Sequence, residues 1–585
     1  MGEIMNEVPY RAHPHCFGLR IKEKYGIEED CFYMDFWPLS DPLLYILDPQ
    51  VAQQVTVENS QPKFEGLKYI MHGIAGPGDM VSSDGPYWKK WRSIMNPGFA
   101  AGHLMSLVPG IIDDCLVFCD NLRKRAEKNE VFRMEDDATR LTVDIIGKVA
   151  LDLKLNAQTG KNELVEAFRE QVQLLPNDQQ GDPFSQWKPY GIWRRWVNSR
   201  KMVDYIGKVL DERFARSGEA SATEKGARKQ RKRAIIDLAL DAYQAQQMGL
   251  EERAVQHKAP VMDAEFRRQA IVQIRTFIFA GHDTTSSTIA YAFYELHRNP
   301  VTLERIRKEH DKILGPVSQT TKRLRDDPHL INKLEYTNAV VKETLRLWPA
   351  ASSARTGAPG FMIREPKTGM MLPTEGYVAW VVPYGIHRHS KIWGETVASF
   401  IPDRFMPENE SSLPENAWRP FEKGPRNCIG QELAMIEARV ILALTCRSFE
   451  FTPAFDAVEE LKNDGSAYAG DDRWRKGVMD LDGEEAWPVL VSNLHTVPSE
   501  VQELMFLLDW NGKASRRNAL SCQSKVYVDS DLTGALTSGD HVKSLSTSAF
   551  VATVVRDRRR ERKESLSKRL QLDICRPPTC ILGNP

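Results

Sequence analysis

The chain has few cysteines, and its nine cysteines among 585 residues are irregularly spaced. An odd, sparse set excludes the disulfide framework of a small secreted domain and fits a reducing compartment. Cys115 and Cys119 lie four positions apart, but no His or Cys near them has a metal-ligand spacing, so both are expected to pack in a helix. The formal net charge of −1 gives no electrostatic reason to expect a nucleic acid partner.

Long apolar runs are also missing. No stretch of about 18 or more apolar residues occurs, so the sequence predicts no transmembrane helix. The first residues, Met1-Gly-Glu-Ile-Met-Asn-Glu, lack the basic and apolar regions of a signal peptide. From its residues alone, the chain is expected to be soluble or peripherally attached to a membrane.

Most of the sequence has the apolar periodicity of amphipathic helices, with a few short apolar runs between them. Helical patterns extend across about 85–95, 104–128, 137–152, 161–176, 263–298, 334–348 and 431–447. Strand-like runs with Gly and Pro punctuation fill 355–385. The fold class predicted is therefore mainly α with small β-sheets.

Three segments lack a clear helical pattern. Residues 177–200, rich in Trp, Pro and Gly, predict a loop with one short helix, and the polar, basic residues 216–233 predict a solvated loop. From 491 to 585 the periodicity weakens and Ser becomes frequent. We interpret 491–585 as a disordered tail or an aberrant, misassigned segment; a basic interaction tail is the alternative.

One ten-residue segment specifies its chemistry most fully. Phe421-Glu-Lys-Gly424-Pro-Arg426-Asn-Cys428-Ile-Gly430 has the pattern F-x-x-G-x-R-x-C-x-G, and a chance match is on the order of 10⁻⁴ from residue frequencies. A thiolate at Cys428 is suited to ligate haem iron, Arg426 to bind a propionate and Phe421 to shield the sulfur. Gly424 and Gly430 let the backbone turn tightly beside a flat macrocycle. The alternative is an inert loop cysteine.

The second site lies in the centre of the long helix, at Ala280-Gly-His-Asp283-Thr284-Thr285. A Thr284 hydroxyl can bond to the carbonyl of Ala280, four residues earlier, and bend or open the helix. Activation of dioxygen requires protons, which the Asp283 carboxyl and the Thr284 hydroxyl are suited to relay. The alternative is an Asp283 paired with a basic neighbour. His282 is expected to pack rather than to bind iron.

The cysteine loop resembles that of the cytochrome P450 family, and the acid–Thr pair matches the distal helix of that family. Two more motifs follow the family order. Trp88-Lys-Lys-Trp-Arg92 is similar to the W-x-x-x-R of its haem-flanking helix, and Glu343-Thr-Leu-Arg346 with Pro402-Asp-Arg404-Phe405 is similar to its E-x-x-R and P-x-R-F pair. The resemblance covers about residues 30–490.

This resemblance implies a P450 fold in one domain, residues 1–490, with haem b between the long distal helix and the helix after the cysteine loop. It implies that Cys428 is the axial ligand and that Trp88, Arg92 and Arg355 reach the propionates. It further implies a structural triad, Glu343, Arg346 and Arg404, that locks the proximal core. His387 is expected to have an ordinary structural role.

The activity implied is a haem-dependent monooxygenase that inserts one atom of dioxygen into an apolar organic substrate. The likeness is to filamentous-fungal microsomal members, some of which serve secondary metabolism. Two alternatives stay open: a P450-type desaturase, ring-coupling enzyme or isomerase, and a haem-binding protein without turnover from a truncated gene. The Asp283–Thr284 pair argues against an isomerase, which needs no protons for dioxygen.

Partners follow from what the chain lacks. No dinucleotide fingerprint or fused flavin segment occurs, and Cys575 and Cys580 are too few for an iron–sulfur cluster. Electrons are therefore expected from NADPH through a separate cytochrome P450 reductase, with cytochrome b5 as a second donor, docked by basic residues that include Lys423. The resemblance implies the cytosolic face of the endoplasmic reticulum. The substrate stays open; Ile274, Phe277, Ile278 and Ala350 are candidate contacts.

Overall fold

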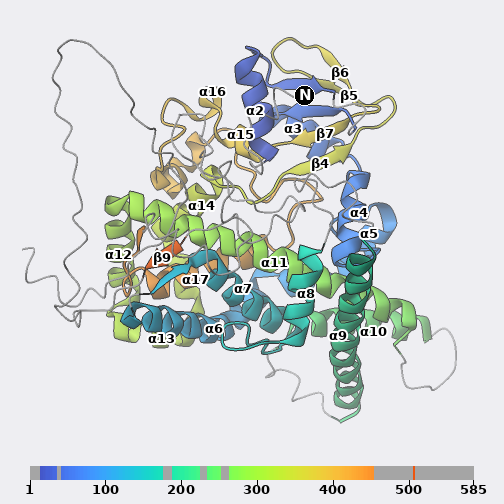
Figure 1. Ribbon diagram of the computed structural model, residues 1–585, viewed down its shortest axis with the longest axis vertical. Helices are drawn as coiled ribbons and strands as arrows, with labels where there is room; N and C mark the ends of the chain where they lie inside the picture. The colour runs from blue at the N-terminus through green and yellow to red at the C-terminus, as the bar shows by residue number, and fades with distance from the viewer. Residues whose placement is uncertain are drawn as a thin grey trace, which may run out of the picture.

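A small β-rich part and a larger helical part make up the protein, as the computed structural model in Figure 1 shows. The structure describes residues 14–35, 41–128, 130–174, 188–223, 233–251, 262–453 and 505–507. The sheet and its covering helices lie at the top of the view, and the helices lie below it. The prediction of a mainly α protein with small sheets is confirmed.

The elements follow one another along the chain in a mostly helical order. The helices are α2 (Pro14–Lys24), α3 (Pro49–Gln53), α4 (Glu65–Ile74), α5 (Gly85–Met95), α6 (Ala101–Lys128), α7 (Met134–Leu151), α8 (Glu163–Gln173), α9 (Pro189–Thr223), α10 (Ile235–Glu251), α11 (Ala264–Arg298), α12 (Pro300–Leu314), α13 (Val317–Asp326), α14 (Glu335–Leu347), α15 (Pro383–His387), α16 (Ser390–Trp393) and α17 (Gln431–Thr445). The strands are β1 (Cys31–Met34), β2 (Leu43–Ile46), β3 (Val131–Arg133), β4 (Ser353–Thr356), β5 (Met362–Arg364), β6 (Met371–Pro373), β7 (Val378–Val381), β8 (Thr452–Pro453) and β9 (Met505–Leu507).

The main sheet has the order β1-β2-β7-β4. Strand β2 pairs antiparallel with β1 and parallel with β7, so segments more than 330 residues apart are joined in register, with Leu44 opposite Ala379. Leu44 and Ile46 are fully buried, as is Val381 opposite Ile46. Because β4 pairs with β7, this sheet also fixes the position of Arg355.

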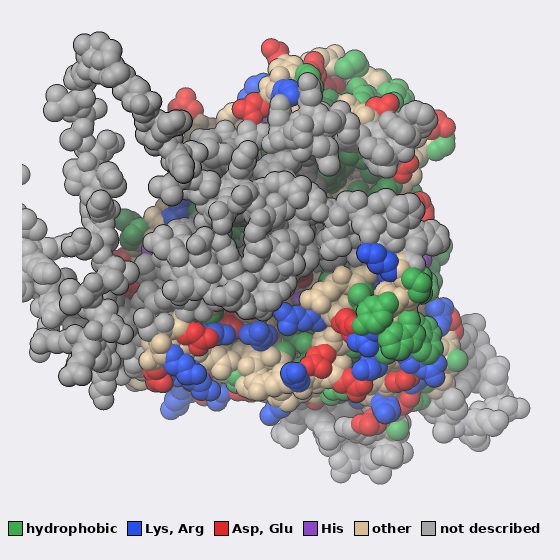
Figure 2. Space-filling view, viewed as in Figure 1, with side chains coloured by type: hydrophobic (Ala, Val, Ile, Leu, Met, Phe, Trp, Pro, Cys, Tyr) green, Lys and Arg blue, Asp and Glu red, His purple; other side chains and the backbone are tan. Residues whose placement is uncertain are grey.

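Helix α11 is the long central helix that the apolar pattern predicted, and it crosses the helical part below the sheet (Figure 1). Asp263 caps its first turn by accepting the N–H of Phe266 at 2.8 Å. Basic and acidic side chains lie interspersed along the lower edge of the same view (Figure 2). The largely buried helix α11 is thus surrounded by elements whose outer side chains are charged.

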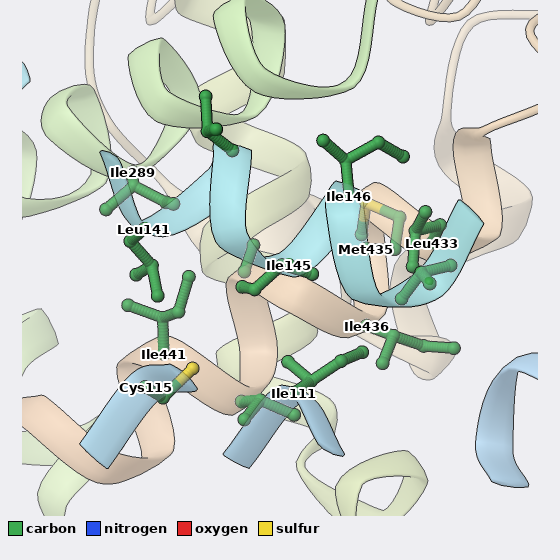
Figure 3. Packing of buried hydrophobic residues seen from close by; sticks show 14 of the residues in the cluster. Ile111, Cys115, Leu141, Ile145, Ile146, Ile289, Leu433, Met435, Ile436 and Ile441 are labelled. Carbon is green, nitrogen blue, oxygen red and sulfur yellow. The ribbon is translucent and has the colours of Figure 1, made fainter. Parts of the chain in front are cut away.

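Helix α7 joins α11 to α6 and α17 through one apolar core. In Figure 3, Ile145 of α7 lies on the side of Ile111 of α6 and Ile436 of α17, whereas Ile146 points to the opposite side of the helix. An added Cβ at Gly281 of α11 would lie 3.0 Å from Ile146 Cδ1, so α7 packs directly on the helix backbone there. This packing holds the helix after the cysteine loop and the distal helix in one rigid unit.

One helix in the described part of the chain, α6, is long and apolar enough to cross a bilayer by length and composition. Half of its most apolar window is buried inside the protein. Leu104, Ile111 and Phe118 belong to the core that α6 shares with α7 and α17. Its apolar character is therefore explained by the core.

Two sequence predictions on loops need correction. Helix α9 begins at Pro189 and continues to Thr223, so residues 189–200 open a long helix rather than a loop with a short one. The polar residues 216–223, predicted to be a solvated loop, are the last turns of the same helix. Local composition misled here because packing on α8 and α11 stabilises the helix.

The C-terminal tail is described at one place. Met505–Leu507 forms β9, which pairs antiparallel with β3 and with β8. The rest of 491–585, and with it the predicted tail, lies outside the described residues. The division at residue 490 stays a prediction.

Candidate active site

The cysteine loop is a tight turn closed by its own backbone. The N–H of Cys428 donates to the carbonyl of Phe421 at 2.9 Å, and the N–H of Asn427 donates to that of Gly424 at 3.1 Å. Gly424 has φ +84°, and a Cβ there would lie 2.3 Å from the carbonyl oxygen of Thr56. The motif therefore requires glycine at this position for both reasons.

The loop leaves the Cys428 side chain accessible. The side chain is exposed, whereas Cys31, Cys115, Cys119 and Cys446 are buried. Burial by the surrounding protein nevertheless raises the pKa of the Cys428 thiol, while the backbone N–H groups of Gly430 and Gln431 and the charge of Arg92 act to lower it. The Cys428 thiol is therefore accessible, although the protein around it disfavours the thiolate.

Helix α11 also has one exposed residue between two buried stretches. Residues 271–278 and 285–296 of this helix are buried, but Ala280 between them is exposed. An alanine exposed in the middle of a core helix marks an open space against that helix. The helix is continuous across these residues.

The acid–alcohol pair lies at this opening. The Thr284 hydroxyl donates to the carbonyl of Ala280 at 2.9 Å, the hydrogen bond that the sequence predicted. Burial raises the pKa of Asp283, and the nearby charge of His282 opposes this rise. His282 donates its Nδ1–H to the carbonyl of Ile278 at 2.6 Å and packs edge-on against Phe168, so its ring has the packing role expected.

Cations gather at the edge of the cysteine loop. Arg355 is fully buried, and its Nη1 donates to the carbonyl of Gln61 at 3.2 Å, while its Nε and Nη2 have no hydrogen-bond partner. Lys63 pairs with Arg355 through an isolated β-bridge. Burial and the charges of Arg355 and Arg426 lower the pKa of Lys63 to about 7. An anionic group bound here would compensate the buried positive charges.

Arg426 and Arg92 make partly different contacts from those expected. Arg426 forms an ion pair with Asp84, donates to the carbonyl of Ser83 at 2.7 Å and lies 4.4 Å over the Trp88 ring. Arg92 donates to Asn427, through the carbonyl at 2.8 Å and Oδ1 at 3.0 Å. Both arginines thus bind the cysteine loop to α5 and its preceding turn, while Trp88 is 9% exposed.

The structural triad comes together as predicted. Arg346 and Glu343 are both fully buried, and they form a two-pronged pair at 2.7 and 2.8 Å. Arg346 also donates to the carbonyls of His387, Val397 and Ser399 at 2.7–3.0 Å. Arg404 pairs less closely with Glu343 than Arg346 does, because its Nε lies 3.6 Å from Glu343 Oε1.

Two neighbours of the triad extend it toward the cysteine loop. His387 donates its Nδ1–H to the carbonyl of Arg346 at 2.9 Å, and its Nε2 accepts the N–H of Arg419 at 3.0 Å. Burial and the adjacent arginines lower the pKa of His387 well below its ordinary value. The neutral imidazole is thus a structural link, as expected.

Sequence reasoning missed two residues of this site. Lys63 belongs to no motif, and only its place next to Arg355 in space shows that it faces the cation cluster. Thr142 of α7 is fully buried, and its hydroxyl lies 3.0 Å from the carbonyl of His282, next to Asp283, and 3.0 Å from that of Ala138. A buried threonine in a helix gives no sequence signal for a contact 140 residues away.

Comparison with known proteins agrees with this geometry. The family model described as Cytochrome P450 matches residues 8–468. The chain therefore belongs to the cytochrome P450 family, and it is a cytochrome P450 monooxygenase by family and by the names of its relatives.

The similar proteins include several from fungi. Cytochrome P450 monooxygenase acrF of Aspergillus aculeatus is 34% identical over 510 residues, which are 84% of this chain and 96% of that protein. Cytochrome P450 monooxygenase polC of Polytolypa hystricis is 32% identical over 458 residues, 78% of this chain and 79% of that protein. Cytochrome P450 monooxygenase ptmG of Penicillium ochrochloron is 27% identical over 427 residues, covering 72% and 75% of the two chains.

The residues of the site fit the haem that the family uses. The Cys428 thiol is suited to ligate the iron, and the exposed α11 face at Ala280 leaves room for a flat ligand. The unpaired guanidinium nitrogens of buried Arg355 are suited to bind the anionic propionates. The family accordingly implies haem, dioxygen and a redox partner that supplies electrons.

Proposed function

We propose that this enzyme inserts one oxygen atom of dioxygen into an apolar small molecule, with Cys428 as the haem ligand. The observation that supports the ligand best is the exposure of the Cys428 side chain, since the four other described cysteines are buried. Bound haem would supply the activation of dioxygen; the protein supplies the binding, orientation and electrostatics.

Arg355 and Lys63 would hold the haem propionates. Arg355 has two nitrogens without a hydrogen-bond partner, and the pKa of Lys63 is lowered by burial and by the charges of Arg355 and Arg426, so an anionic group would stabilise both cations. Arg92 and Arg426 would contribute positive charge while they fix the loop through Asn427 and Asp84. Phe421 packs edge-on against Trp418 and would exclude water from the sulfur.

Haem retention tests this assignment. Lys63→Met is expected to weaken haem binding by about 10- to 100-fold, the usual effect of losing a supporting contact around a metal site. The measurement is the rate of haem transfer to an excess of apomyoglobin. Lys68→Met is the matched control, because Lys68 is an α4 surface residue paired with Glu65. Equal transfer rates for both variants would remove Lys63 from the haem site.

Asp283 and Thr284 would deliver protons to dioxygen at the opening of α11. The raised pKa of Asp283 keeps its carboxyl closer to protonation near neutral pH, which suits a donor. The Thr284 hydroxyl, held by the carbonyl of Ala280, accepts a hydrogen bond through its free lone pairs and can position a water molecule.

Replacement of Thr284 by alanine should separate electron use from product formation. Thr284→Ala is expected to raise peroxide release relative to product by on the order of tenfold or more, since positioned proton transfer contributes about 10²–10⁴-fold. Thr284→Ser, which keeps the hydroxyl, should stay near the wild-type ratio. The measurement is peroxide and product per NADPH oxidised, and an unchanged ratio in the alanine variant would exclude Thr284 from the relay.

The electron donor we propose is NADPH–cytochrome P450 reductase, with cytochrome b5 as a second donor. Lys89 and Lys90 are exposed on α5, the helix that Arg92 ties to the cysteine loop. Lys423, the lysine singled out in the sequence, is half-buried and donates to Asn416 at 3.3 Å, so it is the weaker docking candidate. Reduction by an acidic partner should slow as ionic strength rises.

A role in fungal secondary metabolism and a place on the cytosolic face of the endoplasmic reticulum complete the proposal. The fungal monooxygenases acrF, polC and ptmG support the first part by their similarity. The substrate class is tested by a spectral binding screen with polyketides, terpenoids and fatty acids, followed by incorporation of ¹⁸O from dioxygen. A bound compound oxidised without ¹⁸O in the product would favour the desaturase or ring-coupling alternative.

A further inference from the structure

Helix α11 carries a buried cation that the proposed chemistry does not use. Arg275 is 3% exposed and lies where α11 packs against α4 and α9, two helices at the right of Figure 1. Its Nη2 donates to the carbonyl of Ile74, the last residue of α4, and its Nη1 donates to Ser199 Oγ of α9 at 3.2 Å. Both acceptors are neutral, and Arg275 Nε is buried without a hydrogen-bond partner. No Asp or Glu of the described residues forms an ion pair with this guanidinium.

The lack of a paired acid distinguishes Arg275 from most other buried arginines of the described chain. Three of these arginines form ion pairs, namely Arg346 with Glu343, Arg419 with Glu422 and Arg447 with Asp311. Among the described arginines, only Arg275 and Arg355 combine the absence of a paired acid with an unpaired buried nitrogen. Burial is the largest cause that lowers the pKa of each to about 10. A buried charge of this kind is costly unless a counter-charge binds it.

Arg355 indicates what such a cation is suited to bind. We have assigned Arg355 to a haem propionate, which is a carboxylate, and Arg275 has the same combination of features on another element. The planar guanidinium matches a carboxylate through parallel hydrogen bonds. The alternative is that Arg275 only caps the C-terminal end of α4. A cap explains the bond from Nη2 to Ile74, but it leaves Nε without an acceptor.

The surroundings of Arg275 are apolar on the side that leads to the α11 opening. Val272 and Phe279 lie one turn before and one turn after Arg275, and both pack with Met71 and Ala75 at the end of α4. Phe279 is only partly buried and directly precedes the exposed Ala280. A ligand with its carboxylate at Arg275 would therefore rest its body on Phe279 and reach the opening.

Helix geometry relates this cation to the oxygen site. Arg275 and Thr284 are nine residues apart, which is about 13 Å along the axis and two and a half turns, so they lie on opposite sides of α11. A charged group bound at Arg275 is thus kept away from Thr284, whereas the far end of its apolar body can approach the Thr284 side past Ala280.

We propose that Arg275 binds a carboxylate of the substrate, whose apolar body passes over Phe279 toward Ala280 and Thr284. The substrate class is then an amphiphilic carboxylic acid that is oxidised far from its acid group. This inference rests on the proposed function, because it names the class of substrate of the same site. Arg275 would act in specificity and positioning, since it lies away from the reacting atoms.

Acids and their methyl esters test this assignment on the full haem-loaded chain, because the two members of a pair differ in charge but share one apolar body. The probes are dodecanoic, hexadecanoic and abietic acid, each with its methyl ester. We expect at least one acid to bind about tenfold or more tightly than its ester, as a buried hydrogen bond to a charged group predicts. The measurements are Kd from the shift of the Soret band and Kd from calorimetry.

Substitution of Arg275 should remove this preference. In Arg275→Gln, the Kd of the acid should rise by about tenfold or more, and the Kd of the ester should stay unchanged. Arg275→Lys, which keeps the charge, should still favour the acid. The matched control is Arg307→Gln, because Arg307 is equally buried and also donates to two carbonyls, those of Cys446 and Phe449. This control should bind the acid as the wild type does.

Several results would overturn the proposal. These are equal affinity for acid and ester in every wild-type pair, equal losses in Arg275→Gln and Arg307→Gln, and calorimetric binding of the acid without a Soret shift. Tighter acid binding in Asp178→Asn/Asp182→Asn would also overturn it, since these acids lie outside the described residues and would then already pair with Arg275. If Arg275→Gln takes up no haem, the wild-type ratio and Arg275→Lys decide the question.

The position of the new oxygen gives a second readout. In the acid that binds most tightly, we expect oxidation at a carbon roughly 13 Å from the carboxylate, as measured by mass spectrometry of the product. Oxidation next to the carboxylate would contradict the placement at Arg275. Acid binding that depends on Arg275 but gives no product would count against the proposed monooxygenase instead, so failure of the two proposals can be told apart.

Discussion

Replacement of Cys428 by alanine is expected to abolish the thiolate-type carbon monoxide spectrum of the reduced protein and to lower turnover by more than about 100-fold. No other described residue can substitute, because Cys31, Cys115, Cys119 and Cys446 are buried, and burial raises the pKa of each of these thiols. The measurement is the reduced-plus-carbon-monoxide difference spectrum with iron content per chain.

Cys446→Ala is the matched control. Cys446 lies just after α17, the helix that begins at Gln431, three residues beyond Cys428, and its side chain is buried. Its loss should cost about 1 kcal/mol of packing and leave the thiolate spectrum intact. A thiolate-type band that persists in Cys428→Ala would contradict the ligand assignment, and a wild-type chain that takes up no haem would overturn the proposal of a haem enzyme.

Replacement of Arg346 by leucine is expected to be the most destabilising single change in the proximal core. It would leave the Glu343 carboxylate buried without its partner, which costs about 3–5 kcal/mol. It would also remove the donors to the carbonyls of His387, Val397 and Ser399. The measurement is the midpoint of urea or thermal unfolding together with the fraction of chain that takes up haem.

Arg305→Leu is the control for this prediction. Arg305 makes a similar two-pronged pair with Asp403, at 2.6 and 2.8 Å, but both side chains are more than 40% exposed. Solvent screens that pair, so its loss should cost about 1 kcal/mol or less. Equal losses of stability in the two variants would show that burial of Glu343 and Arg346 does not decide their contribution.

Much of the site could be predicted from local spacing. The Gly424 turn, the hydrogen bond from Thr284 to Ala280 and the pair of Glu343 with Arg346 each need only a few neighbouring residues. Such contacts can be predicted from sequence spacing because a turn or a helix brings their partners together. The long central helix was predictable for the same reason.

Contacts between distant segments could not be predicted in this way. The propionate role of Arg426 stays a prediction, but its ion pair with Asp84, 342 residues earlier, had no signal in the sequence. Helix α9 was expected to be mostly loop, because Pro, Gly and Trp weaken the local pattern, and its packing on α8 and α11 overrides that preference. The exposure of Trp193 and Trp196 also depends on which face of α9 the core takes.

The sequence by itself determined the family, the thiol that would bind iron and the acid–alcohol pair of the distal helix, because these depend on residue type at short, fixed spacing. Only the tertiary structure decided that Lys63 joins Arg355, that Thr142 reaches the carbonyl beside Asp283, and that α9 offers its tryptophans to the outside. These relations arise when packing brings distant segments together, and no local pattern in the chain specifies them.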